Sequence, residues 1–199
     1  MVDSDVIEVR RSPGRPRSAE ADEAILEAAV EIFAEMGLEG LTVEGVAVRA
    51  GVGKATIYRR YPGKIDLVVA AARCLTRGPE LPPDTGSTRG DLRELIDSLV
   101  TMLTTTPLGR VLPILVAART RVAELDRAYA EIVAEKRARS AAVVRRGIER
   151  GDLRADIDPE LVVDCYVSPI FYRFLITSAR LDDAFAAAVV DMTMCAFGA

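Results

Sequence analysis

Histidine is absent from all 199 residues of this chain, and its absence excludes several classes of enzyme. A Ser-His-Asp triad, a Cys-His pair, an HExxH zinc helix and any imidazole general base all require it. Catalysis by carboxylates alone stays formally open, but no carboxylate pair stands out, because the acidic residues fall at helix starts and on polar faces. We therefore expect no catalytic residue, no metal site and no cofactor.

Cysteine pairs and long apolar runs are missing too. The three cysteines, Cys74, Cys165 and Cys195, are far apart and form no CxxC pair, which favours reduced, buried thiols over a disulfide frame, with a redox role as the alternative. No apolar run approaches the roughly 18 residues of a membrane span, and the N-terminus is charged where a secretory signal would be hydrophobic. We expect a cytoplasmic protein with no membrane partner.

The chain also lacks overall positive charge. Its formal net charge is -4 and its sequence pI is about 5.1, so a polyanion would have to be bound by a local basic patch. With 50% hydrophobic and 28% charged residues, the composition is ordinary for a globular chain that buries a core. This length predicts one or two domains.

Helix-forming patterns account for almost the whole chain, so the predicted fold class is all-α. Thr42 and Asp158-Pro159 are helix-start signals, Gly37 and Gly151 are stops, and Pro113 predicts a kink. The nine expected helices span about 18–37, 42–50, 53–61, 64–77, 90–105, 108–119, 124–150, 159–178 and 182–197.

A segment rich in proline and glycine divides the chain. Residues 78–88, GPELPPDTGST, hold three prolines and two glycines and predict a loop at the seam between two parts. The expected organisation is a flexible basic arm over 1–17, a small helical domain over 18–77 and a larger helical domain over 78–199.

Residues 42–61 have the layout of a helix, a short glycine-containing turn and a second helix. This arrangement lets one helix lie across a phosphate backbone while the next enters the major groove of DNA. Gly51 falls in the turn, where a left-handed backbone costs glycine little. The predicted inward side chains are Val46, Ala47, Val52, Ile57 and Tyr61.

The outward face of the second helix carries Lys54, Ala55, Tyr58 and Arg59. Lys54 and Arg59 can donate to guanine acceptors or phosphates, and the small Ala55 can contact a thymine methyl. The Tyr58 hydroxyl can reach a phosphate. We predict that this face binds a double-stranded DNA operator.

Two helix starts add candidate phosphate contacts. Lys64 begins a helix, where a cation opposes the macrodipole, so helix propensity alone does not favour it. A phosphate docked there would be bound by the helix N-terminus and the lysine together; the alternative is a solvated lysine. Thr42 can offer its hydroxyl and amide to a neighbouring phosphate.

An arginine-rich segment, residues 10–17, precedes the first predicted helix. It holds four arginines, including Arg15 and Arg17, and no acid. An extended basic arm suits a narrow minor groove, and Gly14-Arg15-Pro16 resembles the centre of AT-hook segments. The alternative is a disordered tail in which coding bias favours arginine.

Residues 18–75 resemble the DNA-binding domain of the TetR family of transcriptional regulators. The resemblance is carried by residues 28–37, by GLTVEGVA at 40–47 and by AGVGKATIYRRYPGK at 50–64, followed by Leu67. It implies phosphate contacts for Thr42, Tyr58 and Lys64. The positions near base edges are Lys54, Ala55 and Thr56.

The sequence departs from that pattern at two positions. Gly53 stands where the family commonly has a capping Ser or Thr, so the recognition helix is expected to begin less firmly. Arg60 replaces a frequent histidine and adds charge.

Residues 90–197 resemble the family's C-terminal ligand-binding and dimerisation domain, in helix count and in TPLGR at 106–110 and PELVVD at 159–164. The resemblance implies that a small-molecule effector enters this domain and changes the separation of two recognition helices. Repression relieved by an unidentified inducer is the expected mechanism.

The last two predicted helices carry more apolar residues than one core face uses. This surplus predicts a two-fold homodimer in which the same helix pair from each subunit forms a four-helix bundle, and the alternative is that both helices close the monomer core. The candidate interface residues are Cys165, Phe174, Phe185, Val189 and Met192.

A ligand cavity is expected among the helices from residue 90 to residue 178. Its candidate lining residues, each of which could instead be ordinary core, are Met102, Leu115, Tyr129, Phe171 and Tyr172. Arg173 is a cation amid apolar neighbours and needs a partner, either a carboxylate across the dimer or an acidic ligand.

The sequence thus predicts a homodimeric, ligand-responsive DNA-binding regulator that is not an enzyme. Two alternatives come from other classes: a helical effector-binding or partner-binding protein without DNA binding, and a small enzyme acting on a hydrophobic substrate. The absence of histidine disfavours the enzyme, and the presence of Lys54, Tyr58 and Lys64 disfavours the loss of DNA binding.

Overall fold

The computed structural model describes residues 17–77 and 81–199, apart from the side chains of residues 17 and 18. Within these ranges it contains nine α-helices, one π-helix and no β-strand, which confirms the all-α prediction. The helices are α1 (Arg17–Gly40), α2 (Val43–Arg49), α3 (Lys54–Tyr58), α4 (Lys64–Leu75), α5 (Thr88–Thr105), α6 (Leu108–Arg119), α7 (Ala123–Arg150), α8 (Pro159–Phe171), the π-helix η1 (Tyr172–Thr177) and α9 (Asp183–Phe197).

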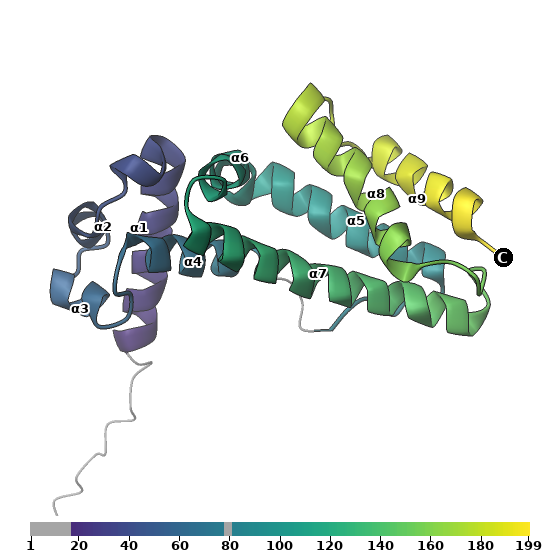
Figure 1. Ribbon diagram of the computed structural model, residues 1–199, viewed down its shortest axis with the longest axis horizontal. Helices are drawn as coiled ribbons and strands as arrows, with labels where there is room; N and C mark the ends of the chain where they lie inside the picture. The colour runs from purple at the N-terminus through teal and green to yellow at the C-terminus, as the bar shows by residue number, and fades with distance from the viewer. Residues whose placement is uncertain (1–16, 78–80) are drawn as a thin grey trace, which may run out of the picture.

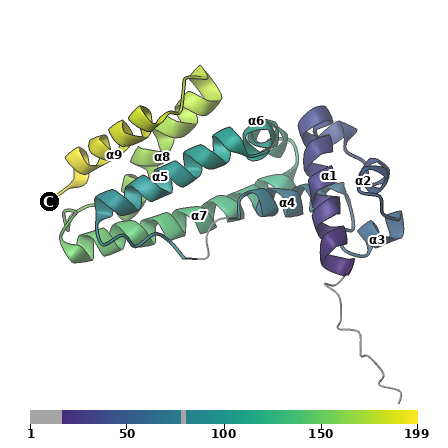
Figure 2. The same ribbon diagram turned by 180° about the vertical axis from the view of Figure 1, so that it is seen from behind.

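The helices form an elongated molecule with α1–α4 at one end and α8 and α9 at the other (Figure 1). Helix α7 runs along much of the length from α4 outward, and the C-terminus lies far from α3. The view from behind shows the same separation of α2 and α3 from α8 and α9 (Figure 2). The two ends can therefore make contacts with different partners.

Apolar side chains of α1–α4 bury one another in a first cluster, around residues such as Ile25, Phe33 and Leu67. The cluster also takes in buried residues of two later helices: Val111 and Leu115 of α6, and Leu125 and Ile132 of α7. Close-packed protein interiors deform little and pass displacements on to their neighbours. The small N-terminal part is therefore packed onto the two helices that follow the seam.

A second cluster fills the space among α5, α7, α8 and α9. Tyr166 of α8 is its largest fully buried side chain. Tyr129 of α7 packs against both clusters and joins them.

Polar side chains begin several helices where the sequence signals predicted. Thr42 caps α2, Asp158 caps α8 ahead of Pro159, and Asp182 caps α9. The helix predicted from about residue 90 begins earlier, at Thr88, because the Ser87 hydroxyl accepts the Gly90 N–H at 3.2 Å. Ser87 is a cap that the sequence interpretation missed.

Two predicted helix boundaries need correction. Gly37 breaks α1 with a left-handed φ of 67°, but a short further turn continues to Gly40. Helix α6, by contrast, has its predicted bounds, Leu108–Arg119, with Pro113 inside it. The helix expected over 159–178 stays α-helical to Phe171 and then widens into η1, shortly after Pro169, which has no amide hydrogen for the α-helical ladder.

A buried carboxylate fastens the start of α5 to the end of α7. Asp91 is fully buried and accepts hydrogen bonds from the Thr85 N–H at 2.6 Å, Arg150 at 2.9 Å and Arg146 at 3.1 Å. Burial raises the pKa of Asp91, but the hydrogen bonds from Thr85, Arg150 and Arg146 together outweigh it and lower the pKa to about 2. The carboxylate is therefore charged and paired at neutral pH.

Candidate nucleic-acid interface

Helices α2 and α3 form the predicted helix-turn-helix. Val46 and Ile57 are fully buried, and Gly51 takes the left-handed φ of 66° that the turn requires. The Val52 N–H donates to the Ala47 carbonyl at 3.0 Å and closes the turn. The inward half of the motif thus fixes how α3 is presented.

The predicted DNA-facing side chains lie on the outer surface of this motif. Exposed side chains belong to Thr42, Lys54, Ala55, Tyr58, Arg59 and Lys64, while Thr56 is half-buried. Tyr58 is 49% exposed, although tyrosine has a large apolar ring. The helices that carry them, α2, α3 and the start of α4, lie together at one end of the molecule (Figure 1).

Both lysines among these side chains already have intramolecular partners. Lys54 Nζ lies 2.8 Å from Glu44 Oε1 on α2, and Lys64 Nζ donates to the Leu38 carbonyl at 3.1 Å. The hydrogen bond from Lys54 lowers the pKa of Glu44, as do its own backbone amide and the Lys54 charge. Lys54 is therefore held by an exposed carboxylate on the same surface.

Thr42 acts as helix cap and as exposed donor at once. Its Oγ1 accepts the Gly45 N–H at 3.0 Å, which satisfies one free amide of α2. The hydroxyl hydrogen is not used in this bond and can be donated outward.

Gly53 is the N-cap residue of α3 and provides no side-chain cap, in line with this departure from the family pattern. Arg60, the other departure, pairs with Asp22 of α1 at 2.8 Å, and its side chain is largely buried. It therefore fastens α3 to α1 rather than adding charge to the outer surface. Arg15 and the side chain of Arg17 lie outside the described residues.

A separate cavity of about 560 Å³ opens among α5, α6, α7 and α8. Three of the predicted lining residues are found there: Met102, Tyr129 and Phe171. A volume of this size lies within the range of small-molecule sites, roughly 300–1,000 Å³. The larger helical part can thus accommodate a ligand.

The other three predicted lining residues lie elsewhere. Leu115 is buried in the first cluster, because it is on the side of α6 that packs against the N-terminal helices. Tyr172 begins η1 and lines a different hollow. Arg173 stacks over the Phe185 ring at 3.8 Å and donates to the Arg180 carbonyl at 2.9 Å, so its partners come from its own chain.

Sequence reasoning missed the charged and hydroxyl residues of the cavity. Those on α7 and α8 are Lys136, Arg137, Arg139, Ser140 and Tyr166. The signal was available, because Lys136 and Ser140 follow Ile132 at intervals of four and therefore share its inward helical face.

Two domain descriptions match this chain: "Tetracyclin repressor-like, C-terminal domain" over residues 82–193 and "Bacterial regulatory proteins, tetR family" over residues 25–71. The chain belongs to the TetR family. An uncharacterized HTH-type transcriptional regulator, YdeS of Bacillus subtilis, is 35% identical over 190 residues, which is 92% of this chain and 91% of YdeS.

Solved structures of TetR proteins share the fold. The TetR family transcription regulator SCO0332 is 32% identical with a TM-score of 0.67, over 88% of this chain and 97% of that one. A complex of SmeT with triclosan is 21% identical with a TM-score of 0.71, over 90% and 92% of the two chains, a likeness that shows the fold alone. This TetR protein is a DNA-binding transcriptional regulator and not an enzyme.

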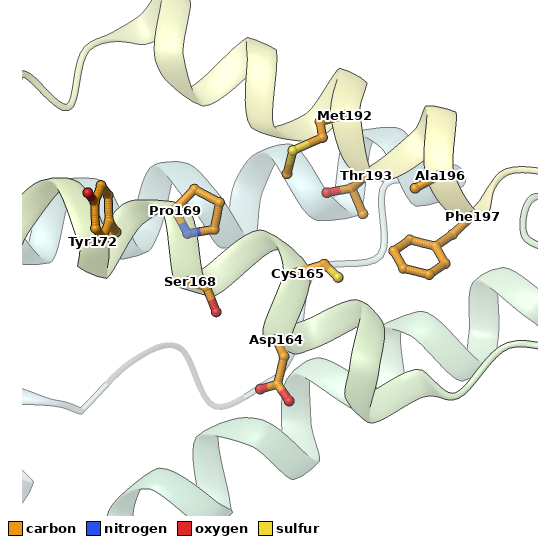
Figure 3. A pocket seen from close by; sticks show the side chains of 9 residues that line it. All are labelled: Asp164, Cys165, Ser168, Pro169, Tyr172, Met192, Thr193, Ala196 and Phe197. Atoms are coloured by element: carbon orange, nitrogen blue, oxygen red, sulfur yellow. The ribbon is translucent and has the colours of Figure 1, made fainter.

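The helix pair α8–α9 of this TetR protein carries an exposed apolar face. A hollow on it is lined by Cys165, Met192 and Phe197, among others (Figure 3). Two large side chains of this hollow are well exposed: Tyr172, at the start of η1, is 59% exposed and Met192 is 46% exposed. Cys165 and Met192 thus lie on this face as predicted interface residues.

The remaining candidate interface residues are more deeply placed. Val189 is buried in the second cluster, because it points from α9 toward the rest of the domain. Phe174 and Phe185 are half-buried and pack against the same cluster. These three side chains serve the monomer core in part or in full.

In the described part of the chain, no single helix is long and apolar enough to cross a membrane, although α5 and α6 taken together meet those limits across a bend of 88°. No group of three or more His, Cys, Asp or Glu side chains in residues 17–77 and 81–199 is arranged to hold a metal ion.

Proposed function

We propose that this TetR protein is a homodimeric repressor that binds a palindromic operator and is released by a small molecule. The observation that carries the proposal is the exposed outer face of the helix-turn-helix. There Lys54, Tyr58 and Arg59 project from α3 and its C-terminal end, while the inner side chains of the motif are buried. A polar and cationic face that is held in place by buried side chains is suited to contact with DNA.

Each side chain has a proposed role at the operator. Thr42, Tyr58 and Lys64 bind phosphates and position the protein. Lys54 and Arg59 donate to base acceptors or phosphates, and Ala55 and Thr56 lie near base edges. Arg15 and Arg17 enter the adjacent minor groove.

Dimerisation sets the spacing of the two recognition helices. We place the two-fold axis at the α8–α9 face, because its exposed apolar side chains are at the opposite end from α3 and would be covered by the same face of a second copy. Operator half-sites then lie one helical turn apart, about 34–36 Å.

Release by a ligand follows from the packing between the cavity and the N-terminal part. Ile132 of α7 lines the cavity and belongs to the first cluster, and Tyr129 touches both clusters. An ion pair of 2.7 Å between Arg73 and Glu131 adds a link from α4 to α7. A ligand that prefers a shifted α7 would therefore favour a half-site spacing unsuited to the operator.

We further propose the division expected from the sequence: an arm over 1–17, a DNA-binding domain over 18–77 and an effector-binding and dimerisation domain over 78–199. The compartment that fits a repressor of this kind is the bacterial cytoplasm, where its operator DNA lies.

The experiment is fluorescence anisotropy of the purified full chain with labelled duplexes that carry palindromes from the DNA flanking its own gene. Binding should be saturable, with two subunits per palindrome, and should fall steeply and log-linearly as salt rises. A scrambled duplex of equal length is the control. Affinity that is equal for both duplexes, or insensitive to salt, contradicts the proposal.

A further inference from the structure

Lys136 is a cation on the inward face of α7. It follows Ile132 and precedes Ser140 by one helical turn each, and all three line the cavity. Ile132 is buried, and Lys136 and Ser140 are half-buried. A lysine thus occupies a position that the helical repeat otherwise gives to core residues.

No carboxylate in residues 17–77 and 81–199 lies within ion-pair distance of the Lys136 ammonium. Burial lowers the pKa of Lys136, the nearby Arg139 charge lowers it further, and Glu135 acts in the opposite direction. A half-buried cation beside another cation is partly desolvated, which costs stability unless an anion joins it.

The other charged groups of the cavity are differently placed. Arg137 is paired with Asp164 and Glu160 outside the cavity, and Asp97 is paired with Arg93 at 2.6 Å. Glu94 is exposed to solvent at the cavity wall. Arg139 also lines the cavity and has an interaction of its own. Lys136 is therefore the cavity cation that most needs a negative partner.

Hydroxyl groups and apolar side chains line the same cavity as Lys136. Ser140 and Tyr166 also line the cavity, and burial raises the pKa of Tyr166 to about 12, so its phenol keeps its proton and can donate to an anion. The apolar lining residues include Leu95, Leu99, Met102, Val133, Val167 and Phe171.

We propose that the cavity binds an amphipathic anion, whose carboxylate or similar acidic group pairs with Lys136 while its apolar body lies along α5 and α8. Describing this ligand as the effector rests on the proposed function, whereas its binding does not. The acidic group of the ligand would supply the negative partner that no carboxylate of residues 17–77 and 81–199 provides for Lys136.

The test is isothermal titration calorimetry of the full chain with straight-chain carboxylates from octanoate to tetradecanoate, the matching alcohols and the matching alkylammonium ions, all below their micellar concentrations. At least one carboxylate should bind about tenfold or more tightly than its alcohol, since a charge-assisted contact is lost in the alcohol. The alkylammonium ion should be weaker still.

Variants locate the anion. Lys136→Gln should lose the preference for carboxylate over alcohol, and Lys136→Arg should keep it. Arg127→Gln removes an exposed cation of α7 outside the cavity lining and is the matched control that should leave the preference unchanged. A second readout distinguishes a purely structural lysine. In the absence of ligand, Lys136→Met should melt no lower than wild type, because it removes a partly desolvated charge.

The proposal is wrong if Lys136→Gln binds carboxylates as wild type does, if alcohols or alkylammonium ions bind as tightly, or if none of the carboxylates binds. If Glu94→Gln weakens the binding of an alkylammonium ion and the Lys136 variants have no effect, the cavity binds a cationic ligand instead. Operator release is measured separately by anisotropy, so carboxylate binding without release contradicts the proposed function and leaves this inference intact.

Discussion

Lys54 of the recognition helix is paired with Glu44 of the preceding helix, with Nζ and Oε1 2.8 Å apart. Both side chains are exposed, and both belong to the surface proposed to meet DNA. The operator therefore competes with a carboxylate of the protein itself for this lysine. An acidic side chain on a DNA-facing surface also repels phosphates, which disfavours weak, non-specific binding.

Glu44→Gln should raise affinity for non-specific DNA more than affinity for the operator. The freed Lys54 can pair with any phosphate, and a negative charge facing the duplex is removed, so we expect about fivefold tighter non-specific binding. Anisotropy with operator and scrambled duplexes at low and moderate salt measures both. Glu39→Gln, an exposed change near the end of α1, is the matched control, and an unchanged operator-to-scrambled ratio in Glu44→Gln would contradict the interpretation.

Lys64→Ala and Lys54→Ala should differ in how they depend on DNA sequence. Lys64, at the start of α4, is proposed to bind a phosphate, so its loss should weaken binding to every operator variant by a similar factor and reduce the salt slope by about one. Lys54→Ala should also relax the preference at one or two base positions. Affinities for a set of single-base operator variants provide the measurement, and a loss at only one base position in Lys64→Ala would reverse the assigned roles.

Gly53→Ser should stabilise the protein by about 0.5–1 kcal/mol. Gly53 has a φ of -73°, which serine adopts freely, and a Cβ built there meets no atom within 4 Å. The hydroxyl can cap α3, which now has no side-chain cap. Urea denaturation of the full chain measures the change.

Gly51→Ser is the control for that substitution. Its Cβ would also lie in open space, but φ is +66°, so serine is strained there and stability should fall by about 1–2 kcal/mol. The same sign of change in both variants would show that φ does not decide the outcome.

Asp91→Asn should lower the free energy of unfolding at pH 7 by about 3 kcal/mol, because Arg146 and Arg150 lose a buried carboxylate. The pKa of Asp91 is about 2 in the folded protein and 3.8 in its ordinary state, so the carboxylate stabilises the fold above about pH 4 and loses this effect as pH falls toward 2. Urea denaturation at several acidic pH values should show wild type and variant converging.

Asp191→Asn is the matched control for Asp91→Asn, since Asp191 pairs with Arg89 on the surface. It should cost less than about 1 kcal/mol at any pH. An equal loss in the two variants would mean that burial of Asp91 is not the reason for its effect.

Met192→Glu should convert the proposed dimer to monomer without unfolding the chain. Met192 is 46% exposed and lines the α8–α9 hollow, so a glutamate is solvated in the monomer but would be desolvated by a second copy. Sedimentation equilibrium measures the association, and circular dichroism checks the fold. Val48→Glu on the exposed side of α2 is the control, and an unchanged dimer in Met192→Glu would move the interface elsewhere.

Local signals were enough to predict most of the helices and the exposed side chains of the helix-turn-helix. Thr42, Asp158 and Asp182 cap helices because a short polar side chain reaches amides two or three residues away. Gly51 forms the turn because glycine has no Cβ and adopts a positive φ at little cost. The outward position of Lys54 and Tyr58 follows from the 3.6-residue repeat around buried Ile57. These effects act over a few residues, so they can be predicted from the local sequence.

Partners that are distant in the chain could not be assigned from the sequence. Arg173 was expected to face a carboxylate or ligand, yet it stacks on Phe185. Leu115 and Tyr172 have the apolar character of cavity residues but face the first cluster and the α8–α9 hollow. Which of several apolar faces encloses a space depends on how helices cross, and the residue pattern of one helix does not specify that.

The amino-acid sequence by itself determined the all-α architecture, the helix-turn-helix and the side chains that it presents, because helix periodicity, caps and turns depend on near neighbours. Only the tertiary structure decided that Glu44 holds Lys54 and that Arg60, just after α3, pairs with Asp22 of α1. It also decided that Lys136 lines a cavity with no carboxylate of residues 17–77 and 81–199 within ion-pair distance. Those relationships depend on the distance between segments remote in the chain, and packing of the whole core sets that distance.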